Sequence, residues 1–167
     1  DSSKVLREAL FQGAVDLAFL GDEADTSGLV SSTFYALPAV CALPATHPLA
    51  RKVVLDLADL RDALLIGLSA TDPAQRRLEQ AFSDAGITPR FVIETPYSAT
   101  QCALVLAGAG LAITNPLVAA EHAPLGLRSI PITTGGVHFR ALLAFQPRQA
   151  QSRAAQEFVS LCRQRLP

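Results

Sequence analysis

The sequence contains no methionine and no tryptophan, and only 3 of its 167 residues are cysteine. A chain without methionine cannot begin at an ordinary start codon, so we expect a fragment or a processed product. Cys41, Cys102 and Cys162 are odd in number and include no CxxC pair, which argues against a disulfide framework. Because they fall in apolar strand-like or helical runs, we expect them to be buried small hydrophobic residues. This sparse use of cysteine favours a reducing, cytoplasmic setting.

Charged residues are also few, at 17% of the chain, and the formal net charge is −1. This balance provides no basic surface for nucleic acid or for an anionic membrane. The longest apolar runs are far below the roughly 18 residues of a membrane span, and the N-terminal sequence DSSKVLREAL lacks the apolar segment of a signal peptide. Because 50% of the residues are hydrophobic, we expect a sizeable core in one domain or two small lobes.

Strand-like apolar runs and helical patterns alternate between about residues 60 and 132. This alternation predicts an α/β fold with a parallel sheet and helices on both of its faces. The flanking segments 1–43 and 138–167 are expected to form a first lobe, and 44–137 a second lobe, with crossings near 40–46 and 133–140. Helices are expected at 3–12, 73–85, 98–108, 116–122 and 152–165, and strands at 15–20, 64–68, 91–95, 111–114, 127–132 and 139–145.

Two extended segments near the N-terminus carry more specific expectations. The run at 15–20 is short and apolar, which is typical of a buried parallel strand. The run at 34–43 contains Pro38, which favours an edge strand or an irregular crossing segment.

Three helix starts can be recognised from their residue types. Asn115 before Pro116 has the pattern of an N-cap followed by proline at the first helical position. Asp72 before Pro73 opens another helix in the same way, with Gln75 at the spacing of a capping box.

The third start is at Ser98, which is followed by Gln101 at capping-box spacing, while Tyr97 and Cys102 occupy the positions of a hydrophobic staple. All three starts follow directly after strand-like runs. The carboxyl ends of parallel strands lie at one edge of a sheet, where helix N-termini attract anionic ligands. The sequence therefore predicts a carboxylate-binding site at this edge.

The polar residues expected at this site are those nearest the three helix starts: Ser69, Tyr97, Ser98, Thr100 and Asn115. For Ser98 and Asn115 the alternative is plain capping, which stabilises a helix by about 1 kcal/mol without any ligand. Tyr97 would alternatively only staple its helix. Asp22, at the end of the first-lobe strand, would suit an ammonium or guanidinium group of the ligand, or would simply be a solvated loop residue.

Patterns typical of catalytic or metal-binding sites are missing from the sequence. The sequence has no GxSxG motif, no P-loop and no complete GxGxxG motif. His47, His122 and His138 stand alone, without the spacing of metal ligands. We therefore expect no catalytic residues, no metal and no cofactor, and we expect that the chain is not an enzyme.

Five segments occur in the order and spacing of a known family: LREALFQGAVDLAF, VCALPATHPLA, DLADLRDALLIG, PAQRRLEQAFSDAGITPRFVIET and CALVLAGAGLAITNP. Together they resemble the effector-binding domain of LysR-type transcriptional regulators, over nearly the whole chain. The NP ending of the last segment is similar to members that sense basic amino acids and opines.

The resemblance implies a periplasmic-binding-protein-like fold of two Rossmann-like lobes joined by two crossing segments. It also implies a small carboxylate effector bound between the lobes and a cytoplasmic homodimer or homotetramer that contacts DNA only through an N-terminal winged helix-turn-helix absent here. The first lobe is expected to be incomplete at its N-terminus, and the apolar stripe Val5, Leu6, Ala9 and Leu10 is one candidate dimer face. An extracytoplasmic solute-binding protein of a transporter shares this architecture and stays open as an alternative, and an enzyme of a related fold is a weaker one.

Overall fold

The computed structural model describes residues 3–133, 136–147 and 152–165. The chain divides into two compact units: unit 1 comprises Asp1–Ala36 and Arg140–Pro167, and unit 2 comprises Leu37–Phe139. The expected lobe boundaries, at 43/44 and 137/138, lie near these positions but differ from them. Among the described residues, no helix is both long enough and apolar enough to cross a membrane.

Unit 1 is built on a three-stranded sheet with the order β1-β8-β2. The expected strand at 15–20 exists in part, but the prediction of a parallel strand is wrong, because β1 pairs antiparallel with β8 and places Ala18 opposite Ala144. An apolar run shows that a strand is buried on both faces and says nothing of the direction of its neighbour. The elements of unit 1 are α1 (Ser3–Phe11), β1 (Ala18–Gly21), β2 (Val30–Pro38), β8 (His138–Phe145) and α5 (Arg153–Gln164).

The apolar stripe of α1 faces its own sheet. Leu10 is completely buried in a small core with Leu20 of β1, and Leu6 packs against the same core. Of the four residues expected as a dimer face, Val5 is exposed, at 50% of its surface, whereas Leu6 and Ala9 are half-buried and Leu10 is buried. The prediction of a dimer face is therefore wrong for Leu10, because this side chain is completely buried within unit 1. It stays a prediction for Val5, Leu6 and Ala9.

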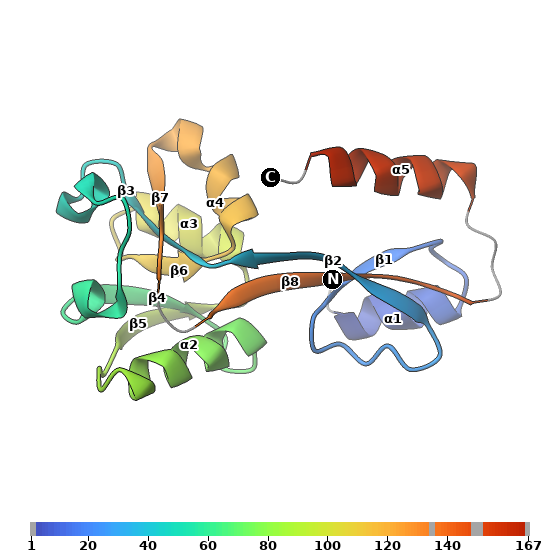
Figure 1. The fold of residues 1–167 in the computed structure, drawn as a ribbon, viewed down its shortest axis with the longest axis horizontal. Coiled ribbons are helices and arrows are strands. Elements are labelled where there is room, and N and C mark those ends of the chain that lie inside the picture. Colours follow the sequence, from blue (N-terminus) through green and yellow to red (C-terminus); the bar gives the residue numbers. More distant parts are fainter. Residues whose placement is uncertain (1–2, 134–135, 148–151, 166–167) are drawn as a thin grey trace. The chain divides into compact units, whose positions relative to one another are not determined.

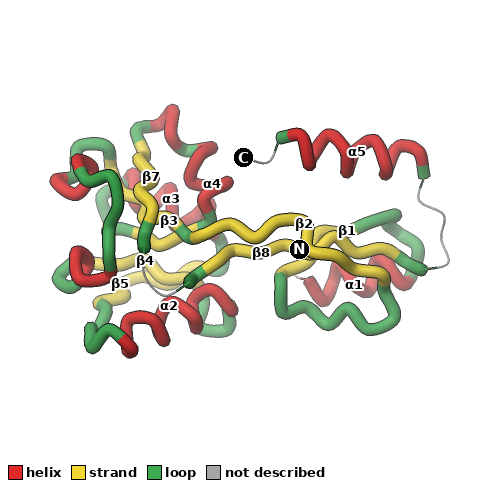
Figure 2. The backbone as a smooth tube through the Cα atoms, viewed as in Figure 1, coloured by secondary structure: helices red, strands yellow, loops and turns green. Residues whose placement is uncertain are grey.

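Unit 2 is a mixed sheet covered by helices on both sides (Figures 1 and 2). The expected helices at 73–85, 98–108 and 116–122 are confirmed. Its strands are β3 (Val40–Pro44), β4 (Leu64–Leu68), β5 (Arg90–Thr95), β6 (Ala112–Thr114) and β7 (Leu127–Pro131). Its α-helices are α2 (Pro73–Asp84), α3 (Ser98–Leu106) and α4 (Pro116–Glu121). Its 3-10 helices are η1 (Pro48–Arg51), η2 (Leu57–Leu60) and η3 (Ala123–Leu125).

Strand β4 lies at the centre of the parallel part of this sheet. It pairs in parallel with β5, with one irregularity between Leu65 and Ile66. On its other side, Leu65 forms one parallel bridge with Leu111, the residue directly before β6. Successive side chains of a strand point to opposite faces. Accordingly, Leu65 packs with Leu78 and Phe82 of α2, while Ile66 belongs to a second core formed with α3 and α4.

The rest of the sheet is antiparallel, in the order β6-β3-β7. The prediction of an edge or crossing segment at 34–43 is confirmed for its first part, because β2 is an edge strand that ends at Pro38 and carries the chain from unit 1 into unit 2. It is wrong for the second part, because β3 is a central strand. Pro38 ends β2 and Pro44 ends β3, so neither proline removes a hydrogen-bond donor from inside the central strand. Since β3 pairs with β6 and β7, residues 40–44 belong to unit 2.

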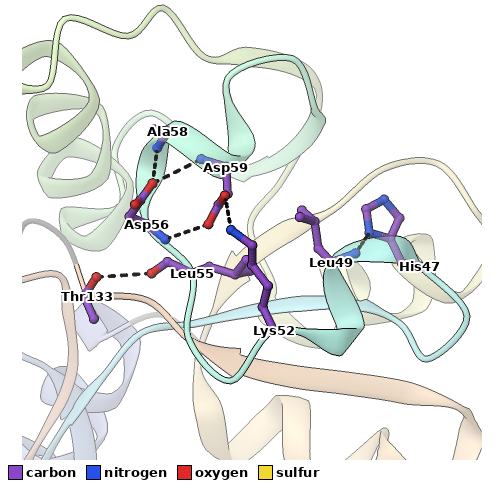
Figure 3. A network of polar contacts seen from close by, with 8 residues as sticks. All are labelled: His47, Leu49, Lys52, Leu55, Asp56, Ala58, Asp59 and Thr133. Atoms are coloured by element: carbon purple, nitrogen blue, oxygen red, sulfur yellow. Dashed lines mark hydrogen bonds and ion pairs between the residues drawn. The ribbon is translucent and has the colours of Figure 1, made fainter.

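The long connection between β3 and β4 is held by a polar network (Figure 3). Asp56 caps η2 by accepting hydrogen bonds from the backbone N–H groups of Ala58 and Asp59, at 2.8 and 3.2 Å. Asp59 accepts in return from the N–H of Asp56 and pairs with the Lys52 ammonium group. This reciprocal capping box orders the approach to β4.

Two of the three cysteines are buried in unit 2, as expected, and Cys162 of α5 is half-buried. Burial raises the pKa of the Cys41 thiol to about 12 and that of the Cys102 thiol to about 11. The hydroxyl group of Thr114 is near enough to Cys102 to lower its pKa slightly, although no hydrogen bond of good geometry joins the two groups. Both buried thiols therefore stay protonated near neutral pH.

Thiol labelling checks this assignment. Because the thiolate is the reactive form, a disulfide reagent at pH 8 should react with Cys162 in the folded chain and reach Cys41 and Cys102 only after unfolding. In Cys162→Ser the reaction of the folded chain should disappear. A second reactive thiol in the folded protein would contradict the burial described.

Two glycines in the AGAG segment offer a matched test of the β4–β6 junction. A Cβ atom on Gly110 would lie 2.6 Å from the backbone oxygen of Leu64, whereas one on Gly108 would meet nothing within 4 Å. Gly108→Ala should cost about 1 kcal/mol, because its φ of +80° is left-handed. Gly110→Ala should cost about 1–3 kcal/mol more, because the backbone must move. Urea unfolding of both variants measures the difference, and equal losses would count against the close approach at Gly110.

Candidate functional site

Three parallel strands end at the same edge of the unit 2 sheet. Because β4 runs parallel to both β5 and β6, the three carboxyl ends face one side. Ser69 follows β4, the segment from Tyr97 to Thr100 opens α3 after β5, and Asn115 follows β6. Five of the six predicted site residues therefore belong to neighbouring strand ends of one unit.

The helices that begin at this edge differ in how their N-termini are capped. The Asp72 carboxylate caps α2, accepting from Ala74 N–H at 2.8 Å. The predicted N-cap at Asn115 is confirmed, since its Oδ1 accepts from Leu117 N–H at 3.0 Å. By contrast, no side chain among the described residues caps α3, whose N-cap residue is Tyr97.

The predicted capping box at Ser98 is wrong for a reason visible in the core. Ser98 is the first residue of α3 and not its N-cap. Gln101 is completely buried, and its Nε2 donates to the backbone oxygen of Ile66 at 2.8 Å. A side chain committed to β4 cannot reach back to the start of its own helix.

The predicted staple at this helix start is also wrong. Tyr97 is 67% exposed while Cys102 is fully buried, so the two side chains do not cover one another. The exposed ring of Tyr97 projects from the edge that carries Ser69 and Asn115, which are both half-buried.

The open N-terminus of α3 has a chemical consequence. The N–H groups of the first turn of a helix have no acceptor within the helix, and the helix dipole adds partial positive charge there. The N–H of Tyr97 donates to Thr95 Oγ1 at 3.4 Å, so the groups concerned are those of Ser98, Ala99 and Thr100. Such an arrangement binds carboxylate or phosphate groups.

Gln75 and Gln101 are the residues that sequence analysis missed. Both were interpreted as capping-box partners, yet Gln75 Oε1 accepts from Leu68 N–H at 3.0 Å instead of turning back to Asp72. Helical spacing would have predicted that Gln75 is buried, because Gln75 lies on the same face of α2 as Leu78 and Phe82. The amphipathic pattern already placed that face against the core.

Asp22 belongs to the other unit. It is half-buried in the turn that follows β1 of unit 1, whereas the other five predicted residues belong to unit 2. Its role in binding a cationic group stays a prediction.

Other features of the described residues do not coincide with this edge. A surface hollow of about 540 Å³ lies at the amino end of β5, lined by Gly86, Ile87, Thr88 and Phe91 among others. No group of three or more His, Cys, Asp and Glu side chains is placed to hold a metal within the described ranges.

Comparison with known proteins identifies the family of this chain. The family model described as LysR substrate binding domain matches residues 1–167. The transcriptional activator protein LysR of Escherichia coli (strain K12) is 36% identical over 125 residues, which cover 75% of this chain and 40% of that protein. This chain therefore spans less than half the length of that regulator.

Two solved structures share the fold. The effector binding domain of QuiR in complex with shikimate has a TM-score of 0.74 at 19% identity, covering 98% of this chain and 78% of the other. The BenM effector binding domain with its effector benzoate has a TM-score of 0.74 at 22% identity, covering 97% and 75%. The chain belongs to the LysR substrate binding domain family and has the periplasmic-binding-protein-like α/β fold of the effector-binding domains of LysR-type regulators.

Proposed function

We propose that the chain senses a small carboxylate metabolite on behalf of a LysR-type transcriptional regulator, with the carboxylate against the N–H groups of Ser98 to Thr100. The observation that carries this proposal is the uncapped N-terminus of α3, beside helices that do have side-chain caps. Ser69, Tyr97 and Asn115 would contact the same ligand.

The nature of the ligand follows from the chemistry of this helix start. Three N–H groups and a helix dipole favour an anion, and hydrogen bonds to a charged group contribute about 1.5–3 kcal/mol each. The benzoate of the BenM structure and the shikimate of the QuiR structure are both carboxylates. An amino-acid-like effector would place its ammonium group against a carboxylate, for which Asp22 is the proposed partner.

Regulation requires that the effector prefer one state of the whole regulator. A ligand shifts an equilibrium between states only by its difference in affinity for them.

The proposed assembly is a cytoplasmic homodimer or homotetramer that contacts DNA through an N-terminal winged helix-turn-helix. The alternative of an extracytoplasmic solute-binding protein is not favoured, because the relatives are named as transcriptional regulators. The gene sequence upstream of this chain distinguishes the two, by a helix-turn-helix or by a signal peptide.

A thermal-shift screen tests the ligand class. Amino acids, opines and aromatic acids should be compared with their amides or esters, which lack the charge. A carboxylate at 100 times its Kd stabilises the folded state by about 2.7 kcal/mol, which corresponds to a rise in melting temperature of about 5–10 °C for a chain of this size. Equal shifts with a carboxylate and its uncharged amide would contradict an anion site.

Thr100→Val tests the position of the site. The substitution keeps the shape of an exposed first-turn side chain and removes its hydroxyl group. If that hydroxyl contacts the carboxylate, calorimetric affinity for the effector found in the screen should fall by about 10- to 150-fold, with little change in the melting temperature.

Thr88→Val is the matched control, because Thr88 is equally exposed but lies at the amino end of β5. Its affinity should equal that of the unaltered chain. Unchanged affinity in Thr100→Val, together with an unchanged melting temperature, would remove Thr100 from the site.

A further inference from the structure

The pairing of β4 with β6 stops after a single bridge. Ile66 N–H donates to Leu111 O at 2.8 Å, and Leu111 N–H donates to Leu64 O at 2.9 Å. If the parallel ladder continued, the oxygen of Ile66 and the N–H of Leu68 would be the next two groups to pair, both with Ile113.

Both of these groups bond to glutamine side chains instead. Gln101 Nε2 donates to Ile66 O at 2.8 Å, and Gln75 Oε1 accepts from Leu68 N–H at 3.0 Å. The two glutamines come from α3 and α2, which pack on opposite faces of the sheet. Their amide groups therefore replace two ladder bonds between neighbouring strands.

The strands concerned carry two proposed site residues. β4 leads into Ser69 and β6 leads into Asn115. Extending the Leu65–Leu111 register would place Ser69 opposite Asn115 at the roughly 4.8 Å spacing of paired strands, which leaves no room for a ligand between them. Replacing backbone bonds by side-chain amides removes this restraint and would let the two strand ends diverge.

The hydrogen bonding of Gln101 indicates that stability is not its main contribution. The residue is completely buried, and its Oε1 has no partner in the described part of the chain. An unsatisfied buried oxygen is costly, and an apolar side chain would avoid that cost. Gln75, in contrast, uses both ends of its amide, because its Nε2 donates to Glu79 at 2.8 Å.

We propose that Gln75 and Gln101 are positioning residues that hold the carboxyl ends of β4 and β6 apart and so set the width of the effector site between Ser69 and Asn115. That an effector occupies the space between these two strand ends rests on the proposed function. That the glutamines separate the strands is argued from their hydrogen bonds alone. The glutamines thereby select the size of the carboxylate ligand that the edge of the sheet accepts.

The first test needs no ligand. In the isotope-labelled chain, the amide proton of Leu68 should show no short-range NOE to the backbone of Ile113. In Gln101→Met, the Ile66 oxygen loses its donor and should turn to the Ile113 N–H, so that this NOE appears and the amide resonances of Leu68–Ala70 and Ser98–Thr100 move. The melting temperature should change by less than about 4 °C, because the Ile66 oxygen exchanges one donor for another while the unsatisfied Oε1 of Gln101 is removed.

Gln80→Met is the matched control, since Gln80 is exposed on α2 and its Nε2 donates to Asp84 at 2.8 Å. It should leave the resonances at both strand ends in place. A Leu68–Ile113 NOE in the unaltered chain would overturn the proposal. So would a Gln101→Met variant whose strand-end resonances do not move, or one that unfolds or melts far lower, since each assigns Gln101 a purely structural role.

Titration with benzoate distinguishes failure of this proposal from failure of the proposed function. In the unaltered chain, benzoate should move the amide resonances of Ser98 to Thr100, and its affinity should change by about tenfold or more in Gln101→Met. If benzoate and the other screened carboxylates leave those amides unmoved, the carboxylate site fails while the NOE comparison still decides whether the glutamines separate the strands.

Discussion

Unit 2 depends on one constraint, which is that the backbone of β4 must find hydrogen-bond partners while both faces of the strand are buried. Buried N–H and C=O groups without partners are costly. β5 satisfies one side of β4, and β6 satisfies the other only as far as the Leu65–Leu111 bridge. Gln75 and Gln101 supply the remaining partners, so the positions of α2 and α3 are tied to β4 by hydrogen bonds as well as by apolar packing.

The same constraint explains why α3 begins with an open N-terminus. A glutamine in the first turns of a helix can either reach back to cap the helix or turn inward. Gln101 turns inward to Ile66, and within the described part of the chain the N–H groups of Ser98 to Thr100 have no side-chain cap. The hydrogen bonding of β4 and the open start of α3 therefore depend on one side-chain conformation.

The connections between the two units also bear on function. The unit boundaries fall within β2 and within β8, so the chain passes between units as strand backbone at both crossings. In unit 1 the apolar stripe of α1 packs on its own sheet, with Leu10 buried.

The sequence by itself determined the α/β class, the three helices of unit 2 and the caps at Asp72 and Asn115, because helical periodicity and capping depend on residues only a few positions apart. The edge that carries Ser69, Ser98 and Asn115 followed from the same local pattern. Only the tertiary structure decided the antiparallel direction of β1, the central place of β3 and the inward turn of Gln101. These depend on partners far away in the chain, such as Ile66, which is separated from Gln101 by 35 positions, and local chemistry does not specify which distant backbone group a buried side chain will meet.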